Sequence, residues 1–419
     1  MRRPPVRRRV EGADGARRHA LRTDRHRRHA LRRALPRPRL AGPRRRTAAA
    51  PLAEAAVRAR PRRATRSGTG RLTMNAATNL HARFVDTLPS FLIRLFARPY
   101  VAGEGLDAGL DVARRLLSGA GIVTTLDLLA EEVRDPARAQ ENAATYLAMV
   151  RGVAADAAFR SARDRPTLSL KPSSFTAAPL DRGGDGAGSR EAIEAIAAEA
   201  RRLGVGLTID MEDHTWTDWT LDVALDLHRR GFDVGTVLQT RLHRTAEDLK
   251  RIPSGMRVRM VIGIYLEPPA IALTEKPAMK ERLLDQSAQL LERGAYVEVA
   301  SHDEALIRRF LREVVVPRGI GGERYEVQML YGVPRAALLA ALANGSVTTR
   351  DKVPPPVRLY VPFATAWDQA TAYCRRRLRN NPAMATYVAL NLLQMLRGKT
   401  PGIAQYQAAA RHMAGAAPR

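Results

Sequence analysis

The 419-residue sequence is poor in cysteine, in aromatic side chains and in long apolar runs. Its single cysteine, Cys374, excludes an intrachain disulfide and a cluster of thiolate metal ligands, and it fits a reducing compartment. No apolar run approaches the roughly 18 residues that a spanning helix needs, and no signal peptide is recognisable. We therefore expect no transmembrane segment and a cytoplasmic location. Peripheral contact with the inner face of the membrane stays open.

Lysine is absent from the first 73 residues, although they hold 24 arginines and a net charge of +20. The remaining +7 of the total +27 is ordinary for an enzyme, so the basic composition belongs to this leader. The leader is rich in proline and alanine and almost lacks aromatic residues, so it cannot bury enough apolar surface to fold. We predict a disordered leader over residues 1–73, translated from GC-rich upstream sequence, with Met74 as the true start. A nucleic-acid-binding arm and a transit peptide are the alternatives.

Short apolar or β-branched runs alternate with helical patterns through the rest of the chain. Eight runs predict strands, at residues 121–128, 167–172, 205–210, 234–239, 258–265, 296–301, 325–330 and 357–362. The helical segments between them end at glycine, as in "SREAIEAIAAEARRLG". Eight strand–helix units in one domain predict a parallel (β/α)8 barrel of the TIM type. We place an N-terminal helical segment at 74–118, the barrel at 119–400 and a tail at 401–419.

Polar side chains end the apolar strand runs. In a parallel barrel the carboxyl ends of the strands meet on one face, where catalytic residues gather. Packing alone explains poorly a ring of charged and amide groups there, so we predict a functional site. Its candidates are Asp127, Lys171, Asp210, Glu212, Asp213, Gln239, Tyr265, Glu267, Ser301, His302, Gln328 and Tyr360.

Three other patterns compete with this site. The neighbours Glu212, Asp213 and His214 suggest a metal, but successive strand side chains point to opposite faces, so we expect none. The segment "DRGGDGAG" resembles a phosphate loop but lacks the Gly-Lys-Ser/Thr ending, and we expect a surface loop. His302 and Cys374 could form a nucleophile pair, but no spacing supplies an orienting acid. A buried structural cysteine is the simpler interpretation.

Three consecutive arginines stand in "YCRRRLRNN", residues 373–381, on a predicted helix. Like charges three and four residues apart on a helix repel by roughly 0.2–0.5 kcal/mol per pair. The crowding is relieved either by solvent, as on most charged faces, or by an anion such as a carboxylate or a phosphate. The pattern by itself leaves both interpretations open.

Eight segments occur in an order that resembles the motif series of bacterial proline dehydrogenase of the monofunctional type. They are "LSLKPS", "IDMED", "VLQ", "RMVIGIYLEP", "ASHD", "VQMLYG", "RLYVPF" and "YCRRRLRNNP", and the resemblance covers roughly residues 84–395. It implies a barrel with its last helix over the mouth and FAD bound without a Rossmann fold. It also implies oxidation of L-proline to Δ1-pyrroline-5-carboxylate, with hydride passing to flavin N5 and electrons to a quinone. The balanced charge after residue 73 argues against nucleic acid as a partner.

The resemblance also implies roles for individual residues. Asp210 and Arg259 take catalytic positions, with Arg259 near flavin N5, where a cation favours the reduced ring. The substrate-binding positions are Lys171, Tyr360, Tyr373, Arg376 and Arg377. The cofactor-binding positions are Met211, Gln239, Arg259, Ile262, Gly263, Ile264, Ser301 and His302. The crowded arginines are then explained, because the substrate carboxylate brings the counter-charge.

The chain departs from the family pattern at three points. Ile262 stands where lysine is usual, and Asn380 stands where a glutamate usually pairs with the first clamp arginine. The spacing from Tyr360 to the arginines is also slightly long, which leaves Arg375 and Arg376 as an alternative pair. These departures bear on the catalytic strength and on the exact substrate. A flavoenzyme acting on another cyclic amino acid such as hydroxyproline is therefore an alternative, as is a nucleic-acid-binding protein that uses the leader.

Overall fold

The computed structural model describes residues 87–130, 133–347, 354–380 and 406. The predicted leader and the start at Met74 lie outside these residues, as does the predicted tail apart from Tyr406. Within the described part, no helix combines the length and apolar character needed to cross a membrane.

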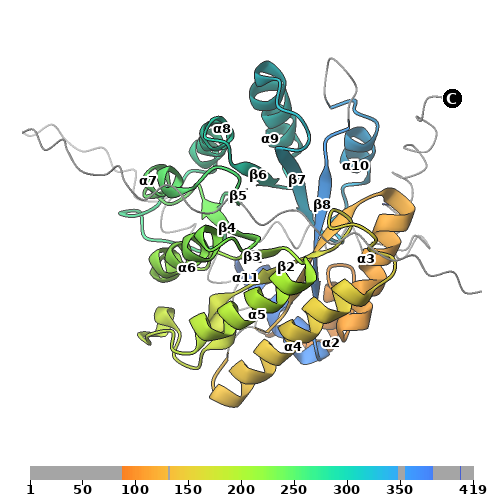
Figure 1. The fold of residues 1–419 in the computed structure, drawn as a ribbon, viewed down its shortest axis with the longest axis vertical. Coiled ribbons are helices and arrows are strands. Elements are labelled where there is room, and N and C mark those ends of the chain that lie inside the picture. Colours follow the sequence, from red (N-terminus) through yellow and green to blue (C-terminus); the bar gives the residue numbers. More distant parts are fainter. Residues whose placement is uncertain (1–86, 131–132, 348–353, 381–405, 407–419) are drawn as a thin grey trace, which may run out of the picture. The chain divides into compact units, whose positions relative to one another are not determined.

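Eight parallel strands close into a barrel in sequence order, and β8 pairs with β1 (Figure 1). The strands are β1 Val123–Leu128, β2 Thr167–Leu170, β3 Leu207–Ile209, β4 Val234–Gln239, β5 Arg257–Val261, β6 Tyr296–Ala300, β7 Tyr325–Leu330 and β8 Val357–Phe363. All eight predicted strands are present, and the predicted fold class is confirmed. The run 258–265 was predicted too long, because the chain leaves β5 after Val261 and Gly263 adopts a φ of +100°.

One helix precedes β1 and the others connect consecutive strands, and together they surround the barrel (Figure 1). They are α3 Leu106–Ala120, α4 Pro136–Ala155, α5 Ser189–Leu203, α6 Thr217–Arg229, α7 Thr245–Asp248, α8 Lys276–Glu292, α9 Glu304–Arg309 and α10 Ala336–Ala343. Local sequence sets their ends. Asp135 caps α4 by accepting a hydrogen bond from Arg138 N at 2.9 Å, and Pro136 opens its first turn. Gly204 ends α5 in the left-handed conformation.

The hydrophobic core lies between the outer face of the barrel and these helices. Alternation along each strand sends one set of side chains outward, and Leu126, Leu168 and Val297 are fully buried in this layer. The other set points into the barrel. In many barrels branched apolar residues fill that space, but here several inward positions are charged or amide side chains. The buried members of this set include Arg259, Glu298, Glu326 and Gln328.

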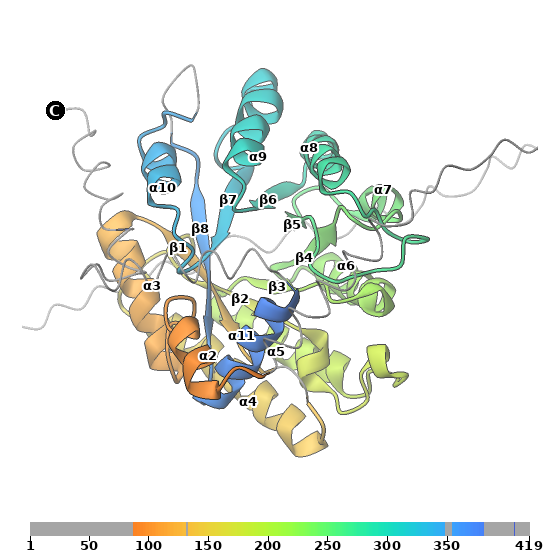
Figure 2. The ribbon, with the colours of Figure 1, turned by 180° about the vertical axis from the view of Figure 1, so that it is seen from behind.

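Two further helices, α2 Ser90–Ala97 and α11 Trp367–Asn380, pack beside each other (Figure 2). Their apolar side chains form a second buried cluster with Leu129, Val333 and Ala364, which follow β1, β7 and β8. The last helix therefore lies at the carboxyl ends of the strands, over the barrel mouth, as predicted. Gly332 permits a close approach here, because at its φ of +82° a Cβ atom would lie 1.8 Å from the carbonyl oxygen of Pro99.

Candidate active site

Four of the predicted site residues meet at the barrel mouth. Asp210 follows β3 and accepts two hydrogen bonds, one on each carboxylate oxygen. Arg259 Nη1 donates to Oδ1 at 2.6 Å, and the hydroxyl of Tyr360 donates to Oδ2 at 2.8 Å. Lys171, directly after β2, donates from Nζ to the Tyr360 hydroxyl at 3.5 Å. Strands β2, β3, β5 and β8 thus each contribute one member of a connected cluster.

Arg259 is the most constrained of the four, with only 5% of its surface exposed. Its Nε donates to Gln328 Oε1 at 2.7 Å, and its Nη1 also reaches Ser169 Oγ at 3.3 Å. The guanidinium carbon lies 5.1 Å from the centre of the Tyr360 ring, in cation–π range. Its Nη2 is buried and has no hydrogen-bond partner among the described residues. A buried donor of this kind is costly to leave unpaired, so its position suits an acceptor that a ligand supplies.

Lys171, a member of this cluster, also forms a buried ion pair with Asp127. Burial alone would lower the pKa of Lys171, but the Asp127 carboxylate beside it raises that pKa well above its ordinary value. Lys171 is therefore protonated at neutral pH and suits an anionic ligand better than it suits proton abstraction. Burial, together with the carboxylates of Asp127 and Asp210, also raises the pKa of Tyr360 well above its ordinary value. Tyr360 consequently keeps its proton, and its hydroxyl donates a hydrogen bond to Asp210.

Glu212 ties together the loops after β2 and β3 and the end of β4. Its carboxylate accepts from Ser173 N at 2.8 Å and from Ser173 Oγ at 2.5 Å. Its backbone carbonyl accepts from Gln239 Nε2 at 2.7 Å, so part of the Gln239 donor capacity is already used. Burial raises the pKa of Glu212 to about 7. The Gln239 amide also lies against Gly263, where a Cβ atom would come within 2.6 Å of Oε1. A larger residue at this position would displace the Gln239 amide and would be strained at the φ of +100°, so glycine is favoured.

The other predicted cofactor positions line the same end of the barrel. Ile262 is half-buried, whereas Ile264 is 57% exposed on the loop after β5. Met211 is buried in the core after β3. Ser301 and His302 follow β6, and His302 Nε2 accepts from Leu330 N at 3.2 Å. These residues lie at the same end of the barrel as the four-residue cluster.

Only part of the predicted clamp on the last helix lies among the described side chains. Tyr373 is buried in the apolar cluster of α2 and α11. Arg375 Nη2 donates to the carbonyl oxygen of Leu88 at 2.9 Å, which links α11 to the segment before α2. The side chains of Arg376, Arg377 and Asn380 lie outside the described residues, so the predicted clamp stays a prediction.

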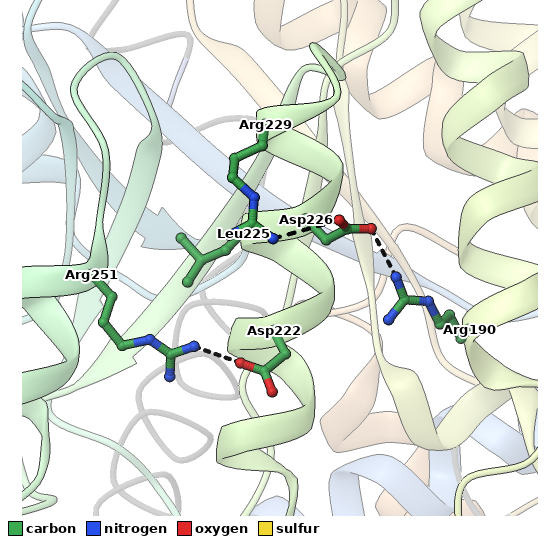
Figure 3. Close-up of a pocket in the computed structure, with 6 residues that line it drawn as sticks. All are labelled: Arg190, Asp222, Leu225, Asp226, Arg229 and Arg251. Atoms are coloured by element: carbon green, nitrogen blue, oxygen red, sulfur yellow. Dashed lines mark hydrogen bonds and ion pairs between the residues drawn. The ribbon is translucent and has the colours of Figure 1, made fainter. Parts of the chain in front are cut away.

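The competing patterns are used structurally. Glu212 binds Ser173, Asp213 caps a short turn at Thr215, and His214 Nδ1 lies 2.6 Å from Glu267 Oε2. Within the described part of the chain, no three His, Cys, Asp or Glu residues group as metal ligands would. A surface pocket also lies near α5, α6 and the turn η4 Leu249–Arg251 (Figure 3), and its lining residues are Arg190, Asp222, Leu225, Asp226, Arg229 and Arg251.

The charges of that surface pocket are largely paired. Asp226 lies 2.8 Å from Arg190 and 3.5 Å from Arg229, and Asp222 pairs with Arg251 (Figure 3). Helix α6 runs back from the barrel mouth, and η4 directly precedes β5, so the pocket lies toward the amino ends of the strands. Barrel chemistry occurs at the opposite end. We assign the pocket no catalytic role.

Comparison with known proteins identifies the family. The proline dehydrogenase of Deinococcus radiodurans is 33% identical over 301 residues, which cover 71% of this chain and 90% of that protein. The chain belongs to the proline dehydrogenase family. The family model described as proline dehydrogenase matches residues 112–267. Proline dehydrogenase 1 of Bacillus subtilis subsp. natto is 30% identical over 302 residues, which cover 72% of this chain and 92% of that protein.

Solved structures share the fold. A crystal structure of proline utilization A from Bdellovibrio bacteriovorus, inactivated by N-propargylglycine, matches with a TM-score of 0.57 at 20% identity. The match covers 68% of this chain and 32% of that longer chain. At this identity the likeness supports the barrel alone. The resemblance to monofunctional proline dehydrogenase found in the sequence motifs is thus confirmed by the sequence relatives, and the barrel by the solved structures.

Several residues around this candidate site were not assigned a role from the sequence. Asp127 and Gln328 were recognised only as polar strand ends, and the structure adds that they bind Lys171 and Arg259. Glu298 and Glu326 were missed. Their signal was a carboxylate inside the apolar strands "YVEVA" and "YEVQML", at positions whose neighbours are apolar.

Proposed function

We propose that this chain is a flavin-dependent dehydrogenase that oxidises L-proline to Δ1-pyrroline-5-carboxylate and passes the electrons to a quinone. The observation that carries the proposal is Arg259. Its buried guanidinium is fixed by Asp210 and Gln328 at the barrel mouth, and Nη2 is left without a partner among the described residues. The setting is a barrel of the proline dehydrogenase family, whose relatives carry that name.

The residues present fit a flavin. The unpaired Arg259 nitrogen suits an acceptor on the ring, and the Gln239 amide retains capacity for the imide edge. Gly263 leaves space beside that amide that a larger residue would fill. Residues proposed to hold FAD are Met211, Gln239, Arg259, Ile262, Gly263, Ile264, Ser301 and His302. When bound, FAD supplies a two-electron acceptor that takes hydride at N5.

The chain's own residues bind and orient the substrate. We assign the proline carboxylate to Lys171, which its neighbours keep protonated, together with Arg376 and Arg377. Arg375 is already used to hold the Leu88 carbonyl, which supports the pair Arg376 and Arg377 over the pair that begins at Arg375. Two guanidinium forks suit a carboxylate bidentately.

Asp210 and the tyrosines complete the assignment. Both Asp210 oxygens are engaged by Arg259 and Tyr360, so we assign Asp210 to holding these two groups in place. Tyr360 then presents its ring beside the substrate, and Tyr373 closes the pocket from α11. Loss of hydride from C5, the carbon next to the ring nitrogen that does not carry the carboxylate, and of a proton from that nitrogen would give the C=N bond of Δ1-pyrroline-5-carboxylate.

An anaerobic titration tests the proposal. Purified protein should be yellow, and L-proline should bleach its flavin absorbance in stoichiometric amounts. Addition of a soluble quinone should restore the absorbance. Protein without flavin, or flavin that L-proline leaves oxidised, contradicts the proposal. Parallel titration with trans-4-hydroxy-L-proline distinguishes the alternative substrate, which would then reduce the flavin at the lower concentration.

A further inference from the structure

A chain of hydrogen bonds leads from Arg259 into the barrel interior. Gln328 Oε1 accepts from Arg259 Nε at 2.7 Å. Gln328 Nε2 donates to Glu298 Oε2 at 2.7 Å and to Glu326 Oε1 at 2.6 Å. Gln328, Glu298 and Glu326 are each 2% exposed. Both hydrogens of the amide group and its oxygen are therefore used inside a space that solvent does not reach.

The two glutamates fix the orientation of the Gln328 amide. In the reversed orientation its oxygen would face two carboxylates and its NH2 group would face a guanidinium, and all three hydrogen bonds would be lost. Carboxylates that accept from the NH2 group also polarise the amide, which strengthens its oxygen as an acceptor. The orientation seen here is thus determined by charge and is the one that binds Arg259.

The glutamates are themselves held by cations. Arg358 Nε donates to Glu326 Oε1 at 2.6 Å, and Arg257 Nη1 lies 3.3 Å from Glu298 Oε1. Although burial opposes ionisation of Glu326, Arg358 beside it lowers the pKa of that carboxyl below its ordinary value. Glu298 also lies 3.6 Å from Arg259 Nε, so its charge acts on the guanidinium directly.

Two edges of the planar Arg259 fork are consequently fixed. Gln328 holds Nε, while Asp210 and Ser169 hold Nη1. With two of its three nitrogens tied, the guanidinium cannot rotate, and the direction of the unpaired Nη2 is determined.

We propose that Gln328, oriented by Glu298 and Glu326, is a positioning residue that aims Arg259 Nη2 at the flavin, and that the Glu298 charge sets how strongly Arg259 stabilises negative charge on the ring. The inference rests on the proposed function, since it requires a bound flavin. It concerns residues that touch neither substrate nor cofactor and act only through Arg259.

Sulfite affinity tests the inference without turnover. Sulfite adds to flavin N5 and leaves negative charge on the ring, so its dissociation constant reports the positive charge that the protein places there. Gln328→Leu should weaken sulfite binding about tenfold, the size of effect known for outer-shell partners of functional ligands. Glu298→Gln should strengthen it, because it removes the negative charge that offsets Arg259.

Matched variants separate positioning from stability. Gln286→Leu alters an amide on α8 that is 3% exposed and remote from Arg259, and it should leave sulfite affinity unchanged. Glu326→Gln removes the same charge as Glu298→Gln but one step farther from Arg259, so its effect should be smaller. A purely structural role would move the melting temperature of each variant without opposite shifts in sulfite affinity. Glu298→Gln is nearly isosteric, so it decides the question even where Gln328→Leu folds poorly.

The outcomes distinguish this inference from the proposed function. Protein without flavin overturns the proposed function and the inference together. Arg259→Met with wild-type sulfite affinity removes Arg259 from the flavin and overturns the inference, while L-proline oxidation is tested separately by the anaerobic titration. Sulfite affinity that responds to Arg259→Met but not to Gln328→Leu or Glu298→Gln overturns the inference alone.

Discussion

Replacement of Arg259 by methionine should lower the reduction potential of the bound flavin. Arg259 is 5% exposed, and methionine keeps much of its length while removing the charge. A unit charge at ~4 Å is worth about 4 kcal/mol at an effective dielectric constant of 20. For a two-electron couple this corresponds to a shift of about 90 mV toward lower potential. Reduction by L-proline should slow accordingly.

Arg257 offers a matched control on the same strand. It points into the barrel two residues earlier and pairs with Glu298 and Asp233. Two residues of β-strand place it roughly 6.6 Å deeper. If this ~6.6 Å is added to the ~4 Å assumed for Arg259, the Coulomb energy between the Arg257 charge and the flavin ring falls to about 1.5 kcal/mol. Arg257→Met should therefore shift the reduction potential by only about 30 mV.

Stability changes are expected in both variants, which is why the control matters. Arg259→Met leaves Asp210 and Glu298 without one of their counter-charges, and breaking a buried pair costs about 3–5 kcal/mol. The potential is measured by anaerobic dye-coupled reduction of flavin-loaded protein, alongside denaturant unfolding. Equal shifts of the reduction potential in the two variants would show that the potential responds to the loss of stability and not to the position of the charge. No shift in flavin-loaded Arg259→Met would remove Arg259 from the flavin.

Three further outcomes are expected. Arg376→Met and Arg377→Met should each weaken L-proline binding about 10- to 100-fold while retaining FAD, since each removes a charged donor worth roughly 1.5–3 kcal/mol. Titration should show that Arg375→Met, which removes the bond to the Leu88 carbonyl, has a mild effect on L-proline binding. Because burial raises the folded-state pKa of Glu212 to about 7 from an ordinary 4.5, its contribution to stability is present below pH 4.5 and is lost as pH rises through 7. Glu212→Gln should therefore gain up to about 3 kcal/mol relative to the parent between those pH values in urea unfolding. A protein that begins at Met74 should keep flavin and activity, and loss of either from a folded truncation contradicts the predicted leader.

The sequence predicted the barrel well because local signals and architecture agree. The strands are largely apolar runs bounded by turn residues, and several helices end at glycine, as α5 does at Gly204, or begin at a cap such as Asp135. The end of β5 was predicted wrongly, since "IGIY" continues the apolar pattern. Only the backbone shows that Gly263 leaves the strand at positive φ.

The candidate site was predictable in its members but not in its contacts. The order of motifs pointed to Lys171, Asp210, Arg259 and Tyr360, and barrel closure then places them within hydrogen-bond reach. The burial of Tyr373 between α2 and α11 depends on how two distant helices pack, which no local pattern encodes. The same holds for the bond that connects Arg375 with Leu88.

Sequence patterns did not identify the charged side chains inside the barrel, although the proposed role of Arg259 depends on them. Buried ion pairs are weak evidence for stability, because apolar residues of similar volume often stabilise a core equally well. Branched apolar layers would therefore suffice to fill this barrel. Glu298, Glu326 and Gln328 instead form a network that ends on Arg259. A fixed cation at the barrel mouth requires partners below it, and apolar layers cannot supply them.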